Sequence, residues 1–176
     1  PGFPAPGAAD SHFHSLAKAI VHQQLALPAA RTIHARVRAL TPGRRFPRPE
    51  ELLKLPAADL RAAGLSGSKA AALLDLSTKT LDGTLRLRGL GRLGDEEVIE
   101  RLVQVRGIGE WTAHMFLLFR LGRLDVMAPA DLGLQQGMKV LDGLAERPTP
   151  RQLAERAECW RPLRSVACWV LWRLVD

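Results

Sequence analysis

Residues 102–131, LVQVRGIGEWTAHMFLLFRLGRLDVMAPAD, constrain the fold more than any other part of the chain. The turn Gly107-Ile108-Gly109 separates two helical patterns, and a loop after the second pattern leads to Asp131. Glycine permits positive φ and close approach of the backbone to a ligand, while Ile108 would anchor the turn. Amides that open the second helix would favour an anion. The stretch predicts two helices joined by a tight turn that binds a phosphate, or the same connection without a ligand.

Helical periodicity extends over the rest of the chain, with short loops at glycine and proline and no alternating β-rich run. The sequence therefore predicts an all-α fold of about ten short helices in two packed lobes with a cleft. We expect the N- and C-terminal helices to form one lobe and roughly residues 45–140 the other, within one domain of residues 11–176. Residues 1–10, PGFPAPGAAD, contain three prolines and two glycines, which predicts a flexible tail.

Capping chemistry predicts several helix boundaries. Asp10 or Ser11 fits the start of the first helix, and Pro28 fits the first turn of the second, where no amide partner is lost. Asp95 is expected to cap the helix that begins with EEVIERL. The spacing of Ala71, Leu74 and Leu81 predicts a further helix that stops at Gly83.

The charge balance favours a polyanionic partner and argues against an acidic surface. The chain has 25 Lys+Arg against 18 Asp+Glu, a net charge of +7, and 20 of the basic residues are arginine. The planar guanidinium suits phosphate better than an ammonium does. The spacing of Cys159 and Cys168 suits neither a disulfide nor a metal site, so we expect buried free thiols. Without a membrane span or a signal-like leader, the expectation is an intracellular protein, cytoplasmic in a bacterium or nuclear in a eukaryote.

Four motifs, in order along the chain, resemble one known family. These are AIVHQQLALPAARTIHARV, GLSGSKAAALLDLS, LVQVRGIGEWTAHMFLLF with a lone aspartate after APA, and WRPLRSVACWVLWRL. Together they resemble the helix-hairpin-helix DNA glycosylases, and within them the 3-methyladenine DNA glycosylase II (AlkA-like) group. The resemblance covers residues 13–174, nearly all of the chain.

The resemblance implies that Asp131 is catalytic. Such enzymes flip a damaged nucleotide out of the duplex and hydrolyse its N-glycosidic bond. A carboxylate near C1′ would stabilise the oxocarbenium-like transition state and orient the attacking water. From the residues alone, Asp131 is typical of a helix N-cap, and both roles are compatible.

The resemblance also implies a pocket for the flipped base, lined by Trp111, Trp172, Met115 and Gln23. Relatives that also cleave the backbone have a lysine at the position of Trp111, so tryptophan predicts a monofunctional enzyme. An indole face attracts the positive charge of alkylated purines such as 3-methyladenine or 7-methylguanine. Either tryptophan could instead belong to the core, and the Gln23 amide could read a base edge or face solvent.

Further residues are implied to contact double-stranded DNA. Relatives insert a wedge from residues 65–69 to fill the space left by the flipped base, but this loop reads Ser66-Gly67-Ser68 where a bulky residue is expected. Either Leu65 is the wedge or the wedge comes from elsewhere. Lys69 and Arg164 are candidate phosphate ligands, or solvated side chains. The DNA-binding set is Gly107, Ile108, Gly109, Leu65, Gly67, Lys69 and Arg164.

The hairpin of relatives commonly holds a monovalent cation, Na⁺ or K⁺, on backbone carbonyls, here those of Val103, Val105 and Ile108. We expect no required cofactor. An iron–sulfur cluster would need four cysteines and the chain has two. We also expect no N-terminal sheet domain of the kind that longer AlkA-like enzymes carry. We expect a monomer that binds duplex DNA containing alkylated bases and no membrane.

The sequence therefore predicts a monofunctional DNA glycosylase of base excision repair that acts on alkylated bases. One alternative is a non-catalytic helix-hairpin-helix module that only binds the duplex backbone, which would need neither Asp131 nor a tryptophan-lined pocket. Another is a glycosylase for oxidised or deaminated bases.

Overall fold

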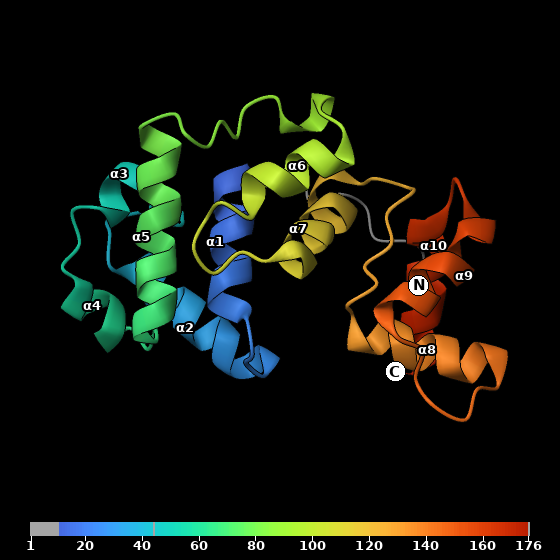
Figure 1. The fold of residues 1–176 in the computed structure, drawn as a ribbon. Coiled ribbons are helices and arrows are strands. Elements are labelled where there is room, and N and C mark those ends of the chain that lie inside the picture. The colour runs from blue at the N-terminus through green and yellow to red at the C-terminus, as the bar shows by residue number, and fades with distance from the viewer. Residues whose placement is uncertain (1–10, 44, 176) are drawn as a thin grey trace. The chain divides into compact units, whose positions relative to one another are not determined.

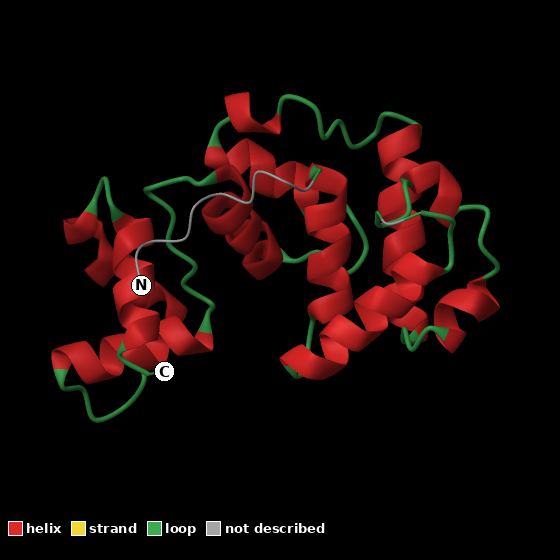
Figure 2. Cartoon of the chain, turned by 180° about the vertical axis from the view of Figure 1, so that it is seen from behind, coloured by secondary structure: helices red, strands yellow, loops and turns green. Residues whose placement is uncertain are grey.

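The computed structural model describes residues 11–43 and 45–175, and every regular element in them is helical (Figures 1 and 2). The predicted flexible tail, residues 1–10, lies outside the described residues. The all-α prediction is confirmed. The helices are α1 His12–His22, α2 Leu27–Ala39, α3 Pro49–Leu52, α4 Ala57–Ala62, α5 Gly67–Leu81, α6 Asp95–Leu102, α7 Glu110–Phe116, α8 Leu132–Asp142, α9 Pro150–Ala157 and α10 Arg164–Arg173, with the short turns η1 Leu90–Arg92, η2 Leu117–Leu121 and η3 Glu158–Trp160.

The helices form two compact units, which divide between Glu110 and Trp111. In the N-terminal unit, α1 packs against α2 and α5, and α3 and α4 also pack against α5. In the C-terminal unit, α8 packs against α9 and α10. The predicted lobes, with the N- and C-terminal helices in one and roughly residues 45–140 in the other, and the cleft between them stay predictions.

The predicted helix starts of the N-terminal unit can be compared with the structure at α1, α2 and α6. Ser11 Oγ accepts the His14 amide at the start of α1, and Pro28 lies in the first turn of α2, so both predictions are confirmed. The prediction for Asp95 is wrong in detail, since Gly94 is the N-cap and Asp95 is the first helical residue of α6. The negative charge of Asp95 still stabilises α6, because it lies at the positive end of the helix dipole.

The helix predicted before Gly83 is present as α5, but the three residues whose spacing predicted it are not the ones that it buries. Leu81 is 51% exposed, and Ala71 and Leu74 are only partly buried. An alanine-rich helix offers more than one apolar face, and the packing of α1, α3 and α4 decides which one is buried. The residues that α5 buries are Ala70, Ala72, Leu73, Leu76 and Ser77.

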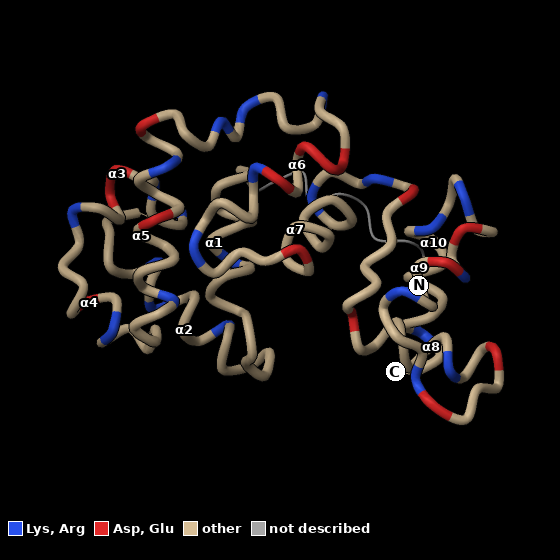
Figure 3. The backbone as a smooth tube through the Cα atoms, in the orientation of Figure 1, with Lys and Arg blue, Asp and Glu red and all other residues tan. Residues whose placement is uncertain are grey.

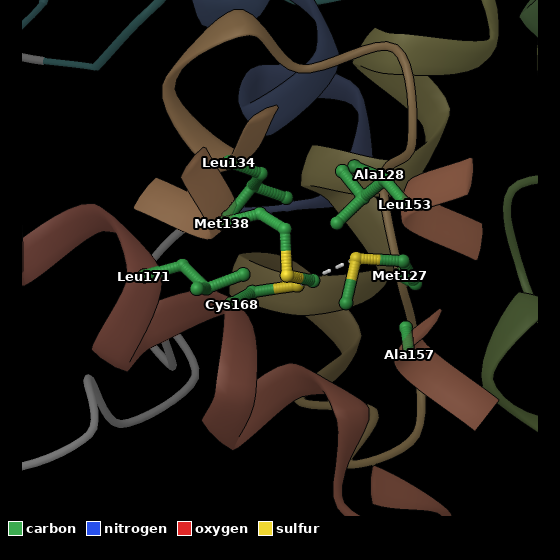
Figure 4. Packing of buried hydrophobic residues seen from close by; sticks show 8 residues of the cluster. All are labelled: Met127, Ala128, Leu134, Met138, Leu153, Ala157, Cys168 and Leu171. Atoms are coloured by element: carbon green, nitrogen blue, oxygen red, sulfur yellow. Dashed lines mark hydrogen bonds between the residues drawn. The ribbon is translucent and has the colours of Figure 1, made fainter. Parts of the chain in front are cut away.

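One apolar cluster holds the C-terminal unit together (Figure 4). Gly137 permits a close crossing of α8 and α10, because a Cβ there would lie 2.7 Å from the Leu171 carbonyl carbon. Burial raises the pKa of the Cys168 thiol to about 12, whereas Cys159 is exposed, contrary to the expectation of two buried thiols. The cluster comprises Met127, Ala128, Leu134, Met138, Leu153, Ala157, Cys168 and Leu171. Because Met127 and Ala128 precede Asp131 and Leu134 follows it, the cluster holds the chain on both sides of Asp131.

Candidate active site

Asp131 is the N-cap of α8 and is 8% exposed. Its Oδ1 accepts the Leu134 amide at 2.8 Å, so the N-cap prediction is confirmed. The preceding loop is held by Gln135, whose Nε2 donates to the Pro129 carbonyl at 2.9 Å. A local capping rule therefore fixes the position of a buried carboxylate at the positive end of a helix.

Two indole N–H groups also donate to this carboxylate. Trp111 Nε1, at the start of α7, lies 2.6 Å from Asp131 Oδ2, and Trp172 Nε1, near the end of α10, lies 3.0 Å from Oδ1. A carboxylate has about four acceptor positions. Donors from residues 11–43 and 45–175 occupy two positions on Oδ1 and one on Oδ2, so within this part of the chain one position on Oδ2 is left. The sequence resemblance assigned both tryptophans to a pocket but did not predict these hydrogen bonds. A buried indole N–H requires an acceptor, and this rule could have pointed to a nearby carboxylate.

Gly133 makes the approach of Trp172 possible. A Cβ at this position would lie 3.0 Å from Trp172 Cδ1 and 3.1 Å from Asp131 Oδ1, tighter than most real contacts. Phe119, from the π-helical turn η2, stacks on the Trp172 ring with centroids 5.7 Å apart. Sequence reasoning missed both residues, since only the tertiary contact gives either one a role.

Apolar side chains beside the acid remain accessible. Trp111 is 44% exposed, and Phe119 and Leu132 are exposed as well. Exposure on this scale argues against a core role for Trp111. Met115 and Trp172 are partly buried and pack against the apolar cluster of the C-terminal unit. The arrangement joins a buried carboxylate to aromatic surface, which suits a planar ligand.

The hairpin turn lies in the N-terminal unit, between α6 and α7. Gly107 adopts φ +77° and Ile108 is buried, as predicted for the turn and its anchor. A Cβ on Gly107 would lie 3.1 Å from the Ala72 side chain, so the turn sits directly on α5. Gln23 Nε2 donates to the Gly107 carbonyl at 2.9 Å, which makes Gln23 a support of the turn. Its predicted contact with a base stays a prediction.

The carbonyls expected to hold a cation belong to this same turn. Val105 O accepts the Ile108 amide at 3.0 Å and keeps a second lone pair. The cation at Val103, Val105 and Ile108 stays a prediction. Within residues 11–43 and 45–175, no group of three or more His, Cys, Asp or Glu side chains could hold a metal ion.

Leu65, Lys69 and Gly67 were predicted to contact DNA. Leu65 and Lys69 have structural roles in the N-terminal unit. Leu65 is 3% exposed and so cannot serve as the wedge in this conformation, because its side chain fills the core. Lys69 Nζ donates to the Val21 and Gln23 carbonyls at 2.8 and 2.6 Å, at the C-terminal end of α1. Its interaction with the helix carbonyls replaces the solvated side chain considered from the sequence. Contact between Gly67 and DNA stays a prediction.

Arg164 lies in a network of ion pairs. Its Nε donates to Asp125 Oδ1 at 2.7 Å, and its other nitrogens donate to the Asp125 carbonyl at 2.8 Å and to Glu158 at 3.1 Å. These ion pairs replace the solvated side chain considered from the sequence, and the predicted phosphate contact of Arg164 stays a prediction. Elsewhere the basic residues are distributed along both units rather than gathered in one segment (Figure 3). Among the described residues, no helix has the length and apolar character needed to cross a membrane.

A helical hairpin followed by a buried aspartate agrees with the family that the sequence resembles, and comparisons with known proteins identify the class of DNA repair protein. The model of the HhH-GPD superfamily base excision DNA repair proteins matches residues 17–162. DNA-3-methyladenine glycosylase 1 of Schizosaccharomyces pombe is 36% identical over 162 residues, covering 92% of this chain and 71% of that protein. DNA-3-methyladenine glycosylase 2 of Escherichia coli is 32% identical over 180 residues, covering 98% of this chain and 60% of that enzyme.

A solved structure gives the same result. The S. pombe 3-methyladenine DNA glycosylase in complex with abasic DNA superposes with a TM-score of 0.86 at 34% identity, covering 98% of this chain and 84% of that one. The chain belongs to the 3-methyladenine DNA glycosylase family of the HhH-GPD superfamily of base excision DNA repair proteins.

Proposed function

We propose that the chain is a monofunctional DNA glycosylase that hydrolyses the N-glycosidic bond of flipped-out alkylated bases, with Asp131 as its catalytic residue. The observation that carries this proposal is the Asp131 carboxylate, buried beside aromatic surface and oriented by three N–H donors. Family membership supports the same activity.

The free acceptor position on Oδ2 defines the chemistry of Asp131. Departure of the base leaves positive charge on the sugar, and a fixed negative charge nearby stabilises that state without reorganisation. Oδ1 is saturated by Trp172 and Leu134, so it orients the group rather than reacting. Oδ2 is left to contact the developing charge at C1′ or to hold the attacking water.

The residue at position 111 supports hydrolysis without strand cleavage. A lyase step needs a lysine that forms a Schiff base with the sugar. Position 111 holds tryptophan, and Lys139 is the only lysine between residues 111 and 176. Lys139 lies eight residues after Asp131, about 12 Å along the axis of α8, and so it does not take the place of a lysine at position 111.

The exposed face of Trp111 favours alkylated bases among the candidate substrates. Bases such as 3-methyladenine and 7-methylguanine carry positive charge, and an indole face attracts a cation by roughly 0.5–2 kcal/mol. Oxidised and deaminated bases lack this charge. We further propose a monomer that acts on duplex DNA in a DNA-containing compartment, with a monovalent cation at the hairpin.

The test is a panel of duplexes that each carry one modified base, incubated with the protein and then treated with or without alkali. The proposal predicts release of alkylated bases and strand cleavage only after alkali. Cleavage without alkali would contradict the monofunctional assignment. Binding without release of any base would favour the non-catalytic module.

A further inference from the structure

Two charged residues of α5 hold the hairpin turn through long-range contacts. Asp75 Oδ2 accepts the backbone amide of Arg106 at 2.8 Å. Lys79 Nζ, one helical turn further along α5, donates to the Gln104 carbonyl at 2.8 Å and to both oxygens of Asp75 at 2.9 and 2.7 Å. An ion pair on α5 therefore contacts the turn through one N–H and one C=O of its backbone.

These contacts decide which turn amides remain free. The amides of Val105 and Ile108 donate within the turn, and the Arg106 amide donates to Asp75. In the part of the chain that the structure describes, the Gly107 and Gly109 amides donate to no protein acceptor. The turn therefore presents two unpaired N–H groups from its glycines, as an anion site requires.

A carboxylate this close to a phosphate site would repel the phosphate unless its charge were balanced. Asp75 and Lys79 form a salt bridge of 2.7 Å, and both side chains are about three-quarters covered. Partial burial raises the pKa of Asp75, but hydrogen bonds from Lys79 and from the Arg106 amide outweigh it, so the pKa lies below its ordinary value. Asp75 thus stays charged, and Lys79 supplies the compensating charge.

We propose that Asp75 and Lys79 are positioning residues for DNA binding, which hold the hairpin turn so that its glycine amides face a phosphate while their own charges cancel. This inference rests on the proposed function, because it takes the hairpin turn to bind a phosphate of the DNA backbone. The two residues have different roles. Asp75 fixes the turn, whereas Lys79 fixes the turn and also prevents Asp75 from repelling the phosphate.

The test compares Lys79→Gln with the double variant Asp75→Asn/Lys79→Gln. Lys79→Gln leaves an uncompensated carboxylate beside the turn. In the double variant, the amide oxygen of the introduced asparagine can still accept the Arg106 amide, and neither position carries a charge. Arg45→Gln is the matched control, since it also removes one cation from an ion pair of the N-terminal unit, with Glu51, but does not contact the turn.

Affinity is measured by fluorescence anisotropy on a duplex with a tetrahydrofuran abasic analogue, over a series of salt concentrations. Lys79→Gln is expected to raise Kd about tenfold, and the double variant to return Kd to within about threefold of wild type, as coupled neighbouring charges do. The single-turnover excision rate at saturating DNA should not change, because Asp131 is untouched. Arg45→Gln should bind the duplex as tightly as wild type does at each salt concentration.

The proposal is overturned if Lys79→Gln binds as tightly as wild type, or if the double variant binds as weakly as Lys79→Gln. Thermal unfolding of each variant separates a loss of affinity from a loss of folding, since a merely structural role would move Tm and affinity together in both variants. If wild type binds the abasic duplex but excises no base, the proposed function fails while the affinity comparison still tests the pair.

Discussion

Trp172→Phe removes one hydrogen bond from the catalytic carboxylate while keeping an aromatic ring against Phe119. The lost bond, Nε1 to Asp131 Oδ1 at 3.0 Å, is charge-assisted and partly buried. Such bonds contribute about 1.5–3 kcal/mol, and each 1.4 kcal/mol corresponds to about tenfold in rate. Because the Leu134 amide still holds Oδ1, we expect the lower end of this range, a decrease of about tenfold in the excision rate.

Single-turnover excision at saturating enzyme measures this effect, with affinity for an abasic duplex measured in parallel. Trp160→Phe is the matched control, since Trp160 packs against the same apolar cluster but has the Arg156 guanidinium, not Asp131, as its polar partner. An excision rate for Trp172→Phe equal to or above that of wild type would refute the claim that this bond orients the carboxylate.

Three further predictions concern packing and pH. Gly133→Ala should slow excision severalfold with little change in DNA affinity, because the new Cβ displaces the Trp172 indole, 3.0 Å away; an unchanged rate contradicts this. Gly137→Ala should lower the stability of the folded state by about 1–3 kcal/mol in a denaturant titration, because its Cβ collides with the Leu171 carbonyl. Burial, the largest cause, lowers the pKa of His34 from 6.5 to about 4, so folding favours its neutral form and Tm should fall as pH drops from 6.5 towards 4. His34→Leu should lessen this fall, and an equal pH dependence in the variant would contradict the assignment.

The sequence predicted several features that depend on local chemistry, although it placed the N-cap of α6 at Asp95 rather than at Gly94. The N-cap role of Asp131, the positive φ of Gly107 and the burial of Ile108 follow from residues within a few positions of each other. Capping and left-handed turns depend on neighbouring backbone groups, and so they can be inferred without knowledge of the tertiary structure.

Long-range contacts could not be inferred in this way. Trp111 and Trp172 lie 20 and 41 residues from Asp131, and no periodicity indicates that both indoles reach its carboxylate. The partners of long basic side chains are harder still to predict, because these side chains bind whichever acceptor the fold brings near. Lys69 binds the end of α1 and Arg164 binds Asp125, where the sequence predicted phosphate contacts or solvent.

Leu65 illustrates a different limit. A leucine before a Ser-Gly-Ser loop fits an exposed wedge or a buried anchor equally well by sequence. The Leu65 amide donates to the Leu60 carbonyl at 3.2 Å, and its side chain is buried, while the serines form the exposed first turn of α5. Burial depends on the packing of the whole unit, so the identity of the wedge cannot be decided from this loop alone.

The central claim is that Asp131 performs the chemistry, and Asp131→Asn tests it most directly. Asparagine still offers an oxygen to the Leu134 amide but carries no negative charge, and Tm with affinity for an abasic duplex controls for folding and binding. On a duplex with a single 7-methylguanine, wild type should release the base, whereas the variant should lose about 10²–10³-fold in excision rate with affinity retained. An Asp131→Asn protein that binds the duplex and still excises the base at the wild-type rate would contradict the account.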